Sequence, residues 1–362
     1  MKYAVIVGTR PEIIKMAILI KKLKELSTAH LFIHSGQHYD YYMDGSMLNT
    51  FDLPTPDFNF KVGSGSHSFV TSEIMKKTED LILKEGITAV IVHGDTNTTL
   101  GACLAAAKLN IPVIHVESGL RSFDKAMPEE INRIIVDHLS TILFVPTKEA
   151  QNNLKKEGIV NRVYMVGQTL VDSIQEVSNK INTDNILKKY GIKPKEYFFV
   201  TCHRQENTNN KSRLTSIVNN LKEISENNQN KIVFSLHPGT KEKLQEFNLY
   251  SLLTDSKIII LDPPVNFARS IHLQKEAKVV LTDSGGLQEE ACILKTPCLT
   301  LRDSTERPET IRCGANRLVN VEKENFLKIL DSYNVLQANW SSPYDIEKPS
   351  EKIIDILTKF LN

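Results

Sequence analysis

Acidic, basic and glycine residues gather in short polar segments that each follow a run of apolar, mostly β-branched residues. The segments read GTRPE from residue 8, HGDTNT from residue 93, HVESGLRS from residue 115, TCHRQEN from residue 201 and TDSGG from residue 282. In open parallel sheets, ligands bind beyond the carboxyl ends of the strands. The segments therefore predict a ligand crevice that is lined by strand ends.

Two of these segments carry groups that suit phosphate. Ser284, Gly285 and Gly286 precede an expected helix, whose first backbone N–H groups lack intrahelical partners and attract anions. The two glycines let a phosphate approach the backbone closely. Arg10 adds a fork of donors, and Lys15 follows about one turn later. A capped turn alone would explain Ser284, but two such segments in one chain predict a diphosphate site.

Carboxylates near the strand ends are a further chemical feature of the sequence. Asp95, Glu117 and either Glu129 or Glu130 fall at or just beyond strand ends in the first half, and His203 does so in the second half. Carboxylates that are desolvated beside a bound diphosphate and beside one another have raised pKa values, which suits general acid–base catalysis. A single acid in such a place is often only a helix cap. The combination with the phosphate segments predicts proton transfer.

Patterns for cofactors and metals are missing from the sequence. It has no P-loop, and the stretch from Gly63 to Ser68 neither completes a dinucleotide fingerprint nor directly follows a strand. Histidines at strand ends, such as His93, His115 and His237, have no metal-ligand spacing, and we interpret them as hydrogen-bonding residues of the crevice rim. The five cysteines form no CxxC pair, which disfavours a zinc site and a disulfide framework. We therefore expect no metal site and no nicotinamide or flavin cofactor.

Apolar runs alternate with helix-length segments along the whole chain. Strands are expected in the first half at Tyr3–Val7, His30–His34, Ala89–His93, Val113–Val116, Ile142–Val145 and Val163–Val166. The second half repeats the plan at Tyr197–Thr201, Lys231–Leu236, Lys257–Leu261, Lys278–Leu281, Cys298–Leu301 and Arg317–Val321. Near-continuous apolar strands are typical of parallel sheets that helices cover on both faces. The pattern predicts an α/β fold with two doubly wound, Rossmann-like domains that face a cleft.

The domain boundary is expected in the Asn- and Lys-rich segment 179–194. This gives an N-terminal domain of residues 1–178 with the acids and a C-terminal domain of residues 179–342 with the glycine segment. Residues 343–362 contain apolar residues at helical spacing from Pro349 to Leu361, and this helix is expected to pack back on the N-terminal domain.

Composition excludes several classes of partner. The 362 residues carry 44 Lys and Arg against 43 Asp and Glu, a net charge of +1, so the chain has no broad positive field for nucleic acid. No stretch approaches the roughly 18 apolar residues of a membrane span, and the first residues form no signal sequence. We expect a soluble cytoplasmic protein that binds neither nucleic acid nor a membrane.

Seven motifs occur in order along the chain: GTRPEIIK, GDTNTT, HVESGLRSF, MPEEINR, HRQEN, TDSGGLQEEA and RDSTERPE. With them, the sequence resembles the non-hydrolysing UDP-N-acetylglucosamine 2-epimerases over nearly its whole length. The resemblance implies a GT-B type fold, a homodimer, a UDP-sugar substrate and no cofactor. It also implies reversible conversion of UDP-GlcNAc to UDP-ManNAc by elimination of UDP to 2-acetamidoglucal and re-addition, in the service of polysaccharide biosynthesis.

The resemblance also assigns residues. It implies a catalytic set of Asp95, Glu117, Glu129 and His203. It implies UDP contacts from Arg10, Lys15, Ser284, Gly285, Gly286, Glu290 and Arg307, with Glu290 on the ribose hydroxyls. Two alternatives stay open, namely a 2-epimerase of a modified UDP-sugar, such as a 2,3-diacetamido uronate, and a GT-B glycosyltransferase, which would require an acceptor.

Overall fold

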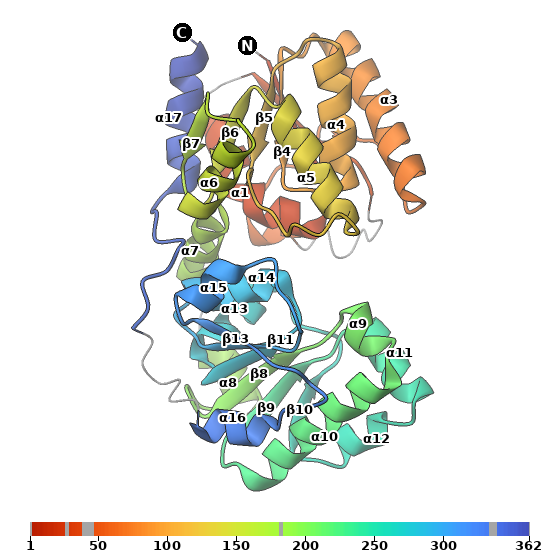
Figure 1. The fold of residues 1–362 in the computed structure, drawn as a ribbon, viewed down its shortest axis with the longest axis vertical. Coiled ribbons are helices and arrows are strands. Elements are labelled where there is room, and N and C mark those ends of the chain that lie inside the picture. Colours follow the sequence, from red (N-terminus) through yellow and green to blue (C-terminus); the bar gives the residue numbers. More distant parts are fainter. Residues whose placement is uncertain (1, 26–28, 38–46, 181–183, 333–338, 362) are drawn as a thin grey trace. The chain divides into compact units, whose positions relative to one another are not determined.

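Parallel strands make up both sheets of the structure, a computed structural model that describes residues 2–25, 29–37, 47–180, 184–332 and 339–361 (Figure 1). The chain divides into two units. Met1–Glu176 together with Tyr344–Asn362 form the first, and Val177–Pro343 form the second. We call them the N-terminal and the C-terminal domain. Among the described helices, none is long and apolar enough to cross a membrane.

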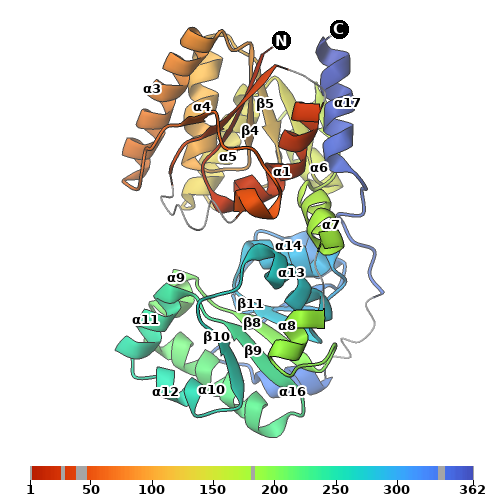
Figure 2. The same cartoon turned by 180° about the vertical axis from the view of Figure 1, so that it is seen from behind.

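The N-terminal domain contains one parallel sheet in the order β3-β2-β1-β4-β5-β6-β7. In that order the strands are Phe58–Asn59, His30–His34, Tyr3–Val7, Ala89–His93, Val113–Val116, Ile142–Val145 and Val163–Met165. Its helices are α1 (Arg10–Glu25), α3 (His67–Glu85), α4 (Asn97–Lys108), α5 (Pro128–Leu139), α6 (Lys148–Lys156), α7 (Leu170–Lys180) and α17 (Pro349–Leu361). Helices α3, α4 and α5 cover one face of the sheet, and α1 and α17 cover the other (Figures 1 and 2). The predicted doubly wound architecture is confirmed for this half.

The burial of the central strands explains why the sequence predicts them as apolar runs. β1 and β4 are buried over their whole length, and every position in them except His93 is apolar. β3 was not predicted, because its two residues pair only with Ile33 and His34 at the sheet edge and are too few to set up a periodic pattern.

Helix α17 packs beside α1 on the same face of the N-terminal sheet. Ile353 is fully buried, and Glu351 Oε1 lies 3.0 Å from Lys22 Nζ of α1. The Ser350 backbone N–H also donates to Asp172 Oδ2 at 2.8 Å. The last helix is therefore part of the N-terminal domain core, although it follows the C-terminal domain in the chain.

The C-terminal domain repeats the plan with the sheet order β10-β9-β8-β11-β12-β13. In that order the strands are Ile258–Leu261, Lys231–Ser235, Tyr197–Thr201, Val279–Thr282, Cys298–Thr300 and Asn316–Leu318. The helices are α8 (Asp184–Lys189), α9 (Gln205–Thr208), α10 (Lys211–Asn227), α11 (Pro238–Glu246), α12 (Tyr250–Thr254), α13 (Phe267–Glu276), α14 (Gly285–Ile293), α15 (Pro308–Arg312) and α16 (Phe326–Ser332). The segment expected as the domain boundary contains α8, whose Leu187 is buried in the core of this domain.

Helices α3 and α4 pack so closely that Gly101 has a packing role. A Cβ at Gly101 would lie 2.8 Å from the Thr71 backbone oxygen and 3.0 Å from Ile74 Cβ. Overpacking of this kind costs about 1–3 kcal/mol, whereas alanine gains about 1 kcal/mol of helix propensity over glycine. Gly101→Ala is therefore expected to lower the free energy of unfolding, by up to about 2 kcal/mol, instead of raising it.

Urea unfolding followed by circular dichroism would measure this change. Ala107→Gly, at a half-buried position of the same helix, isolates the propensity contribution and should cost about 1 kcal/mol. A Gly101→Ala variant more stable than the wild type would contradict the close approach of the two helices.

Candidate active-site residues in the two domains

Each domain has a switch point in its sheet, where the strand order reverses. In the N-terminal domain β1 and β4 are parallel neighbours there, and in the C-terminal domain β8 and β11 are. Crevices at such points are where doubly wound sheets bind ligands. The polar segments that follow these strands are therefore brought together within each domain.

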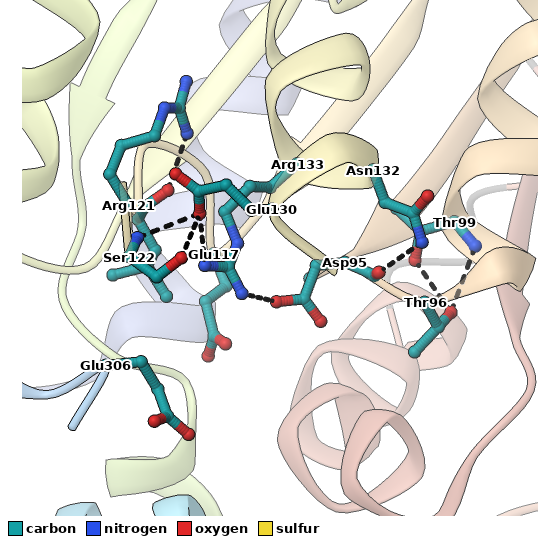
Figure 3. Close-up of polar contacts among 12 residues, drawn as sticks. Asp95, Thr96, Thr99, Glu117, Arg121, Ser122, Glu130, Asn132, Arg133 and Glu306 are labelled. Carbon is teal, nitrogen blue, oxygen red and sulfur yellow. Dashed lines mark hydrogen bonds and ion pairs between the residues drawn. The ribbon is translucent and has the colours of Figure 1, made fainter. Parts of the chain in front are cut away.

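Glu117 lies at the end of β5 (Figure 3) in an unusual backbone conformation. Its φ is +65°, in the left-handed region that a non-glycine residue rarely adopts. Its Oε2 accepts hydrogen bonds from Lys15 Nζ at 2.5 Å and Gln168 Nε2 at 2.6 Å, and His93 Nε2 lies 3.6 Å away. The side chains of Lys15 and Glu117 are only 9% and 7% exposed. Strained, nearly buried and paired residues of this kind cluster at functional sites.

Lys15 and Glu117 are thus two predicted site residues that the fold brings into contact. Gln168 was not predicted, because it follows β7 in no recognisable motif. Arg10, the other predicted cation of this segment, is the half-buried first residue of α1.

Asp95 and Glu130 form a second cluster of carboxylates, and Arg133 of α5 contacts both of them (Figure 3). Arg133 Nη2 contacts Asp95 Oδ2, and its Nη1 lies 2.7 Å from Glu130 Oε2. The Asp95 side chain is 30% exposed, whereas that of Glu130 is 1% exposed. Asp95 is therefore accessible and is oriented by a buried cation.

Glu130 has a structural role. Burial alone would raise its pKa, but backbone hydrogen bonds from Ser122 and Phe123, both 2.9 Å, and the charge of Arg133 hold the pKa below its usual value. The neighbouring Glu129 is exposed in the first turn of α5. Of the two acids left open by the motif, Glu129 is the one that solvent reaches.

Glu12 is a buried acid that was not predicted. It accepts hydrogen bonds from Gly8 N and Thr9 Oγ1, both 2.9 Å, and from Thr96 Oγ1 at 2.8 Å and Thr99 Oγ1 at 3.1 Å. Burial nevertheless raises its pKa. The residue ties the segment after β1 to the segment after β4. Its position three residues after Thr9, the spacing of a capping box, could have identified it.

His115 lies beneath the Asp95 segment and is completely buried, which corrects the interpretation of this residue as part of a crevice rim. Its Nδ1 lies 2.8 Å from Asp137 Oδ1, and its Nε2 lies 2.8 Å from the Gly94 carbonyl oxygen. Asp137 also accepts from Arg121 Nη1 at 2.6 Å. Burial opposes ionisation of Asp137, but His115 and Arg121 hold its pKa below the usual value. Both ring nitrogens of His115 therefore face oxygen atoms of buried neighbours.

In the C-terminal domain, the glycine segment begins helix α14. Ser284 is the N-cap, with its Oγ accepting from Leu287 N at 3.5 Å. A Cβ at Gly285 would lie 2.5 Å from Glu306 Oε1, so a larger residue there would displace the end of the Glu306 side chain. Burial would raise the pKa of Glu306, but charges that include Arg302, 2.8 Å away, lower it to about 2. A carboxylate therefore packs against the first turn of α14.

Two further predicted nucleotide contacts, Glu290 and Arg307, lie on α14 or beside it. Glu290 Oε2 accepts from Gln274 Nε2 at 2.5 Å, and Arg307 Nε lies 2.9 Å from Glu289 Oε1. Both Glu290 and Arg307 are 8% exposed. The fold thus brings Ser284, Gly285, Gly286, Glu290 and Arg307 to one helix and its neighbours.

Among the described residues, no group of three or more His, Cys, Asp or Glu side chains is arranged to hold a metal ion. The polar groups near α14 are instead backbone N–H groups, arginines and hydrogen-bonded carboxylates.

The chain is similar to known proteins over nearly its whole length. The family model described as UDP-N-acetylglucosamine 2-epimerase matches residues 21–358. UDP-N-acetylglucosamine 2-epimerase from Methanocaldococcus jannaschii is 45% identical over 99% of both chains. UDP-2,3-diacetamido-2,3-dideoxy-D-glucuronate 2-epimerase from Pseudomonas aeruginosa is 39% identical over 90% of both chains.

A solved structure gives the same result. The crystal structure of the M. jannaschii enzyme in complex with UDP-GlcNAc and UDP superimposes with a TM-score of 0.88, covering 99% of this chain and 100% of that one. The predicted GT-B type of fold is therefore confirmed, and the chain belongs to the UDP-N-acetylglucosamine 2-epimerase family of isomerases.

Proposed function

We propose that this protein interconverts UDP-GlcNAc and UDP-ManNAc without a cofactor. The observation that carries the proposal is Glu117, a strained and nearly buried carboxylate held by Lys15 beside the Asp95–Arg133 pair. Family membership and the 45% identity to an enzyme of that name support the assignment.

Elimination makes the chemistry possible. The proton on C2 of the sugar is not next to a carbonyl, so its removal requires UDP to leave from C1 with the bonding electron pair on the diphosphate oxygen. The product is 2-acetamidoglucal. Return of UDP to C1 and delivery of a proton to the opposite face of C2 then give the epimer.

Two proton-handling groups are needed, one for each face of C2. We assign them to Asp95 together with Glu117 or Glu129. His203, Arg10 and the first N–H groups of α14 would stabilise the charge on the departing diphosphate, and Glu290 would bind the ribose hydroxyls.

A second candidate substrate is a 2,3-diacetamido uronate linked to UDP. The P. aeruginosa relative of that name favours it, because that enzyme is 39% identical over 90% of this chain. The same carboxylates and the same elimination would serve both sugars. A glycosyltransferase activity remains the alternative on this fold, and it would release UDP only when an acceptor is present.

Proton NMR of the protein with UDP-GlcNAc in D₂O tests the proposal. We expect signals of UDP-ManNAc to appear and deuterium to enter C2, because the abstracted proton exchanges with solvent before re-addition. The diacetamido uronate substrate, run in parallel, distinguishes the two sugars. Saturable binding of UDP-GlcNAc without exchange at C2 would exclude the epimerase activity on this sugar.

We further propose that the protein is a cytoplasmic homodimer that feeds polysaccharide biosynthesis. Size-exclusion chromatography with light scattering would measure the oligomeric state.

A further inference from the structure

Asp283 is fully buried at the end of β11 and organises the segment that follows β8. Its Oδ2 accepts hydrogen bonds from Arg204 N at 2.9 Å, His203 N at 3.0 Å, Asn207 Nδ2 at 3.1 Å and Cys202 Sγ at 3.3 Å. Burial would raise the pKa of Asp283, but His203 and these donors lower it to about 2. The side chain is therefore a carboxylate at neutral pH.

The other oxygen of this carboxylate faces an imidazole ring. His203 Nδ1 lies 3.3 Å from Asp283 Oδ1, and the His203 side chain is 38% exposed. An ionised carboxylate can only accept a hydrogen bond, so Nδ1 carries the proton. This contact orients the ring, and Nε2 is the nitrogen left for solvent or a ligand.

The charged groups around His203 are compatible with this arrangement. The ring of His237, from the segment after β9, lies 5.8 Å away between centroids. Burial, and then the charge of His203, lower the pKa of His237, whereas Asp283 and Glu242 raise it. On the segment of His203 itself, Arg204 Nη2 lies 3.5 Å from Glu306 Oε1. Asp283 is thus the carboxylate that lies against the His203 ring, 3.3 Å from its Nδ1.

We propose that Asp283 is a positioning residue that holds His203 in the Nδ1–H tautomer and stabilises its doubly protonated form. This inference rests on the proposed function. In the elimination step the C1–O bond breaks and its electron pair stays on the diphosphate oxygen. Nε2–H of the cationic ring donates a hydrogen bond to that oxygen, and Asp283 stabilises the positive charge from behind. The arrangement follows the logic by which a buried aspartate sets the histidine tautomer in catalytic triads.

Asp283→Asn tests the tautomer directly. The amide oxygen can keep the Oδ2 position and accept from Arg204 N, which leaves the NH₂ group facing His203 Nδ1. Nδ1 must then accept, so the ring proton moves to Nε2. We expect kcat for C2 exchange to fall about 10²- to 10³-fold, the usual effect of removing one oxyanion-stabilising group, because Nε2 keeps a proton but the carboxylate that stabilises a positive charge on the ring is gone. KM for UDP-GlcNAc should change little.

Nitrogen NMR of protein labelled with ¹⁵N-histidine provides a readout that does not depend on activity. His203→Gln assigns the His203 signals by their disappearance. The wild type should show a proton on Nδ1, and this holds even if Asp283→Asn fails to fold. Asp303→Asn, at a side chain 53% exposed in the same domain, is the matched control and should change neither tautomer nor kcat.

Two results would overturn the inference. One is a wild-type His203 with an unprotonated Nδ1, and the other is an Asp283→Asn variant that keeps both the tautomer and kcat. If the wild type shows the expected tautomer but does not exchange C2 of any UDP-sugar tested, the proposed function fails while the Asp283–His203 assignment stands.

Discussion

Asp137→Ala is expected to lower the free energy of unfolding by about 3–5 kcal/mol, the range for removing one partner of a buried ion pair. The carboxylate lies 2.6 Å from Arg121 Nη1 and 2.8 Å from His115 Nδ1, and the three side chains are at most 1% exposed. It also accepts from Gly119 N at 3.1 Å. Its loss removes the buried partner of His115 Nδ1 and leaves the buried Arg121 with Glu157 as its remaining carboxylate partner among the described contacts.

Urea unfolding followed by circular dichroism measures this effect. Asp80→Ala, an exposed aspartate on α3, is the matched control and should change the free energy by less than about 0.5 kcal/mol. A loss below about 1 kcal/mol for Asp137→Ala would show that the buried pair is dispensable.

The same residue predicts a pH dependence. The folded-state pKa of Asp137 is held below its usual value, so its contribution to stability is present above the unfolded pKa of about 3.9 and disappears as the pH falls through the folded value. The difference in stability between wild type and Asp137→Ala should therefore shrink on acidification below about pH 4.

Glu117→Gln carries the largest expected loss of activity, about 10²- to 10⁴-fold in the rate of C2 exchange, the usual contribution of a general acid or base. The amide keeps the size of the side chain but cannot take up a proton. It also removes the charge that Lys15 Nζ contacts at 2.5 Å. The rate of deuterium entry at C2, measured by NMR under the conditions of the functional test, gives the comparison.

Glu73→Gln is the control for this substitution, because Glu73 is paired only with the exposed Lys76 among the contacts described for it. It should leave the exchange rate unchanged. An exchange rate in Glu117→Gln within a factor of about three of the wild type would remove Glu117 from the proton-handling set.

Much of the fold could be predicted because burial on both faces leaves little freedom of composition. β1, β4 and β8 are almost wholly buried, and each appears in the sequence as an uninterrupted apolar run. Helix α8 was not predicted, because the polar residues on either side of it resemble a linker. A six-residue helix with few buried positions carries too weak a period to be recognised.

The site was predicted only to the level of motifs. Lys15 and Glu117 are 102 residues apart, and their contact depends on β4 lying between β1 and β5 in the sheet. Strand order is a long-range property that local patterns do not encode. Asp283 was visible inside TDSGG, but its four hydrogen-bond donors come from residues 202–207, about 80 positions earlier.

The position of α17 has a consequence for how the protein is made. The C-terminal domain is continuous in the chain, whereas the N-terminal domain needs residues that the ribosome adds only after the C-terminal domain. At about 5–20 residues per second, the interval between Glu176 and the end of α17 lasts roughly 10–40 s. During that time α17 is not yet present to cover the apolar face of α1 in the nascent N-terminal domain. Chaperone binding during synthesis is expected to concentrate on that face of α1, and to end when Ile353 of α17 packs into the core of the N-terminal domain.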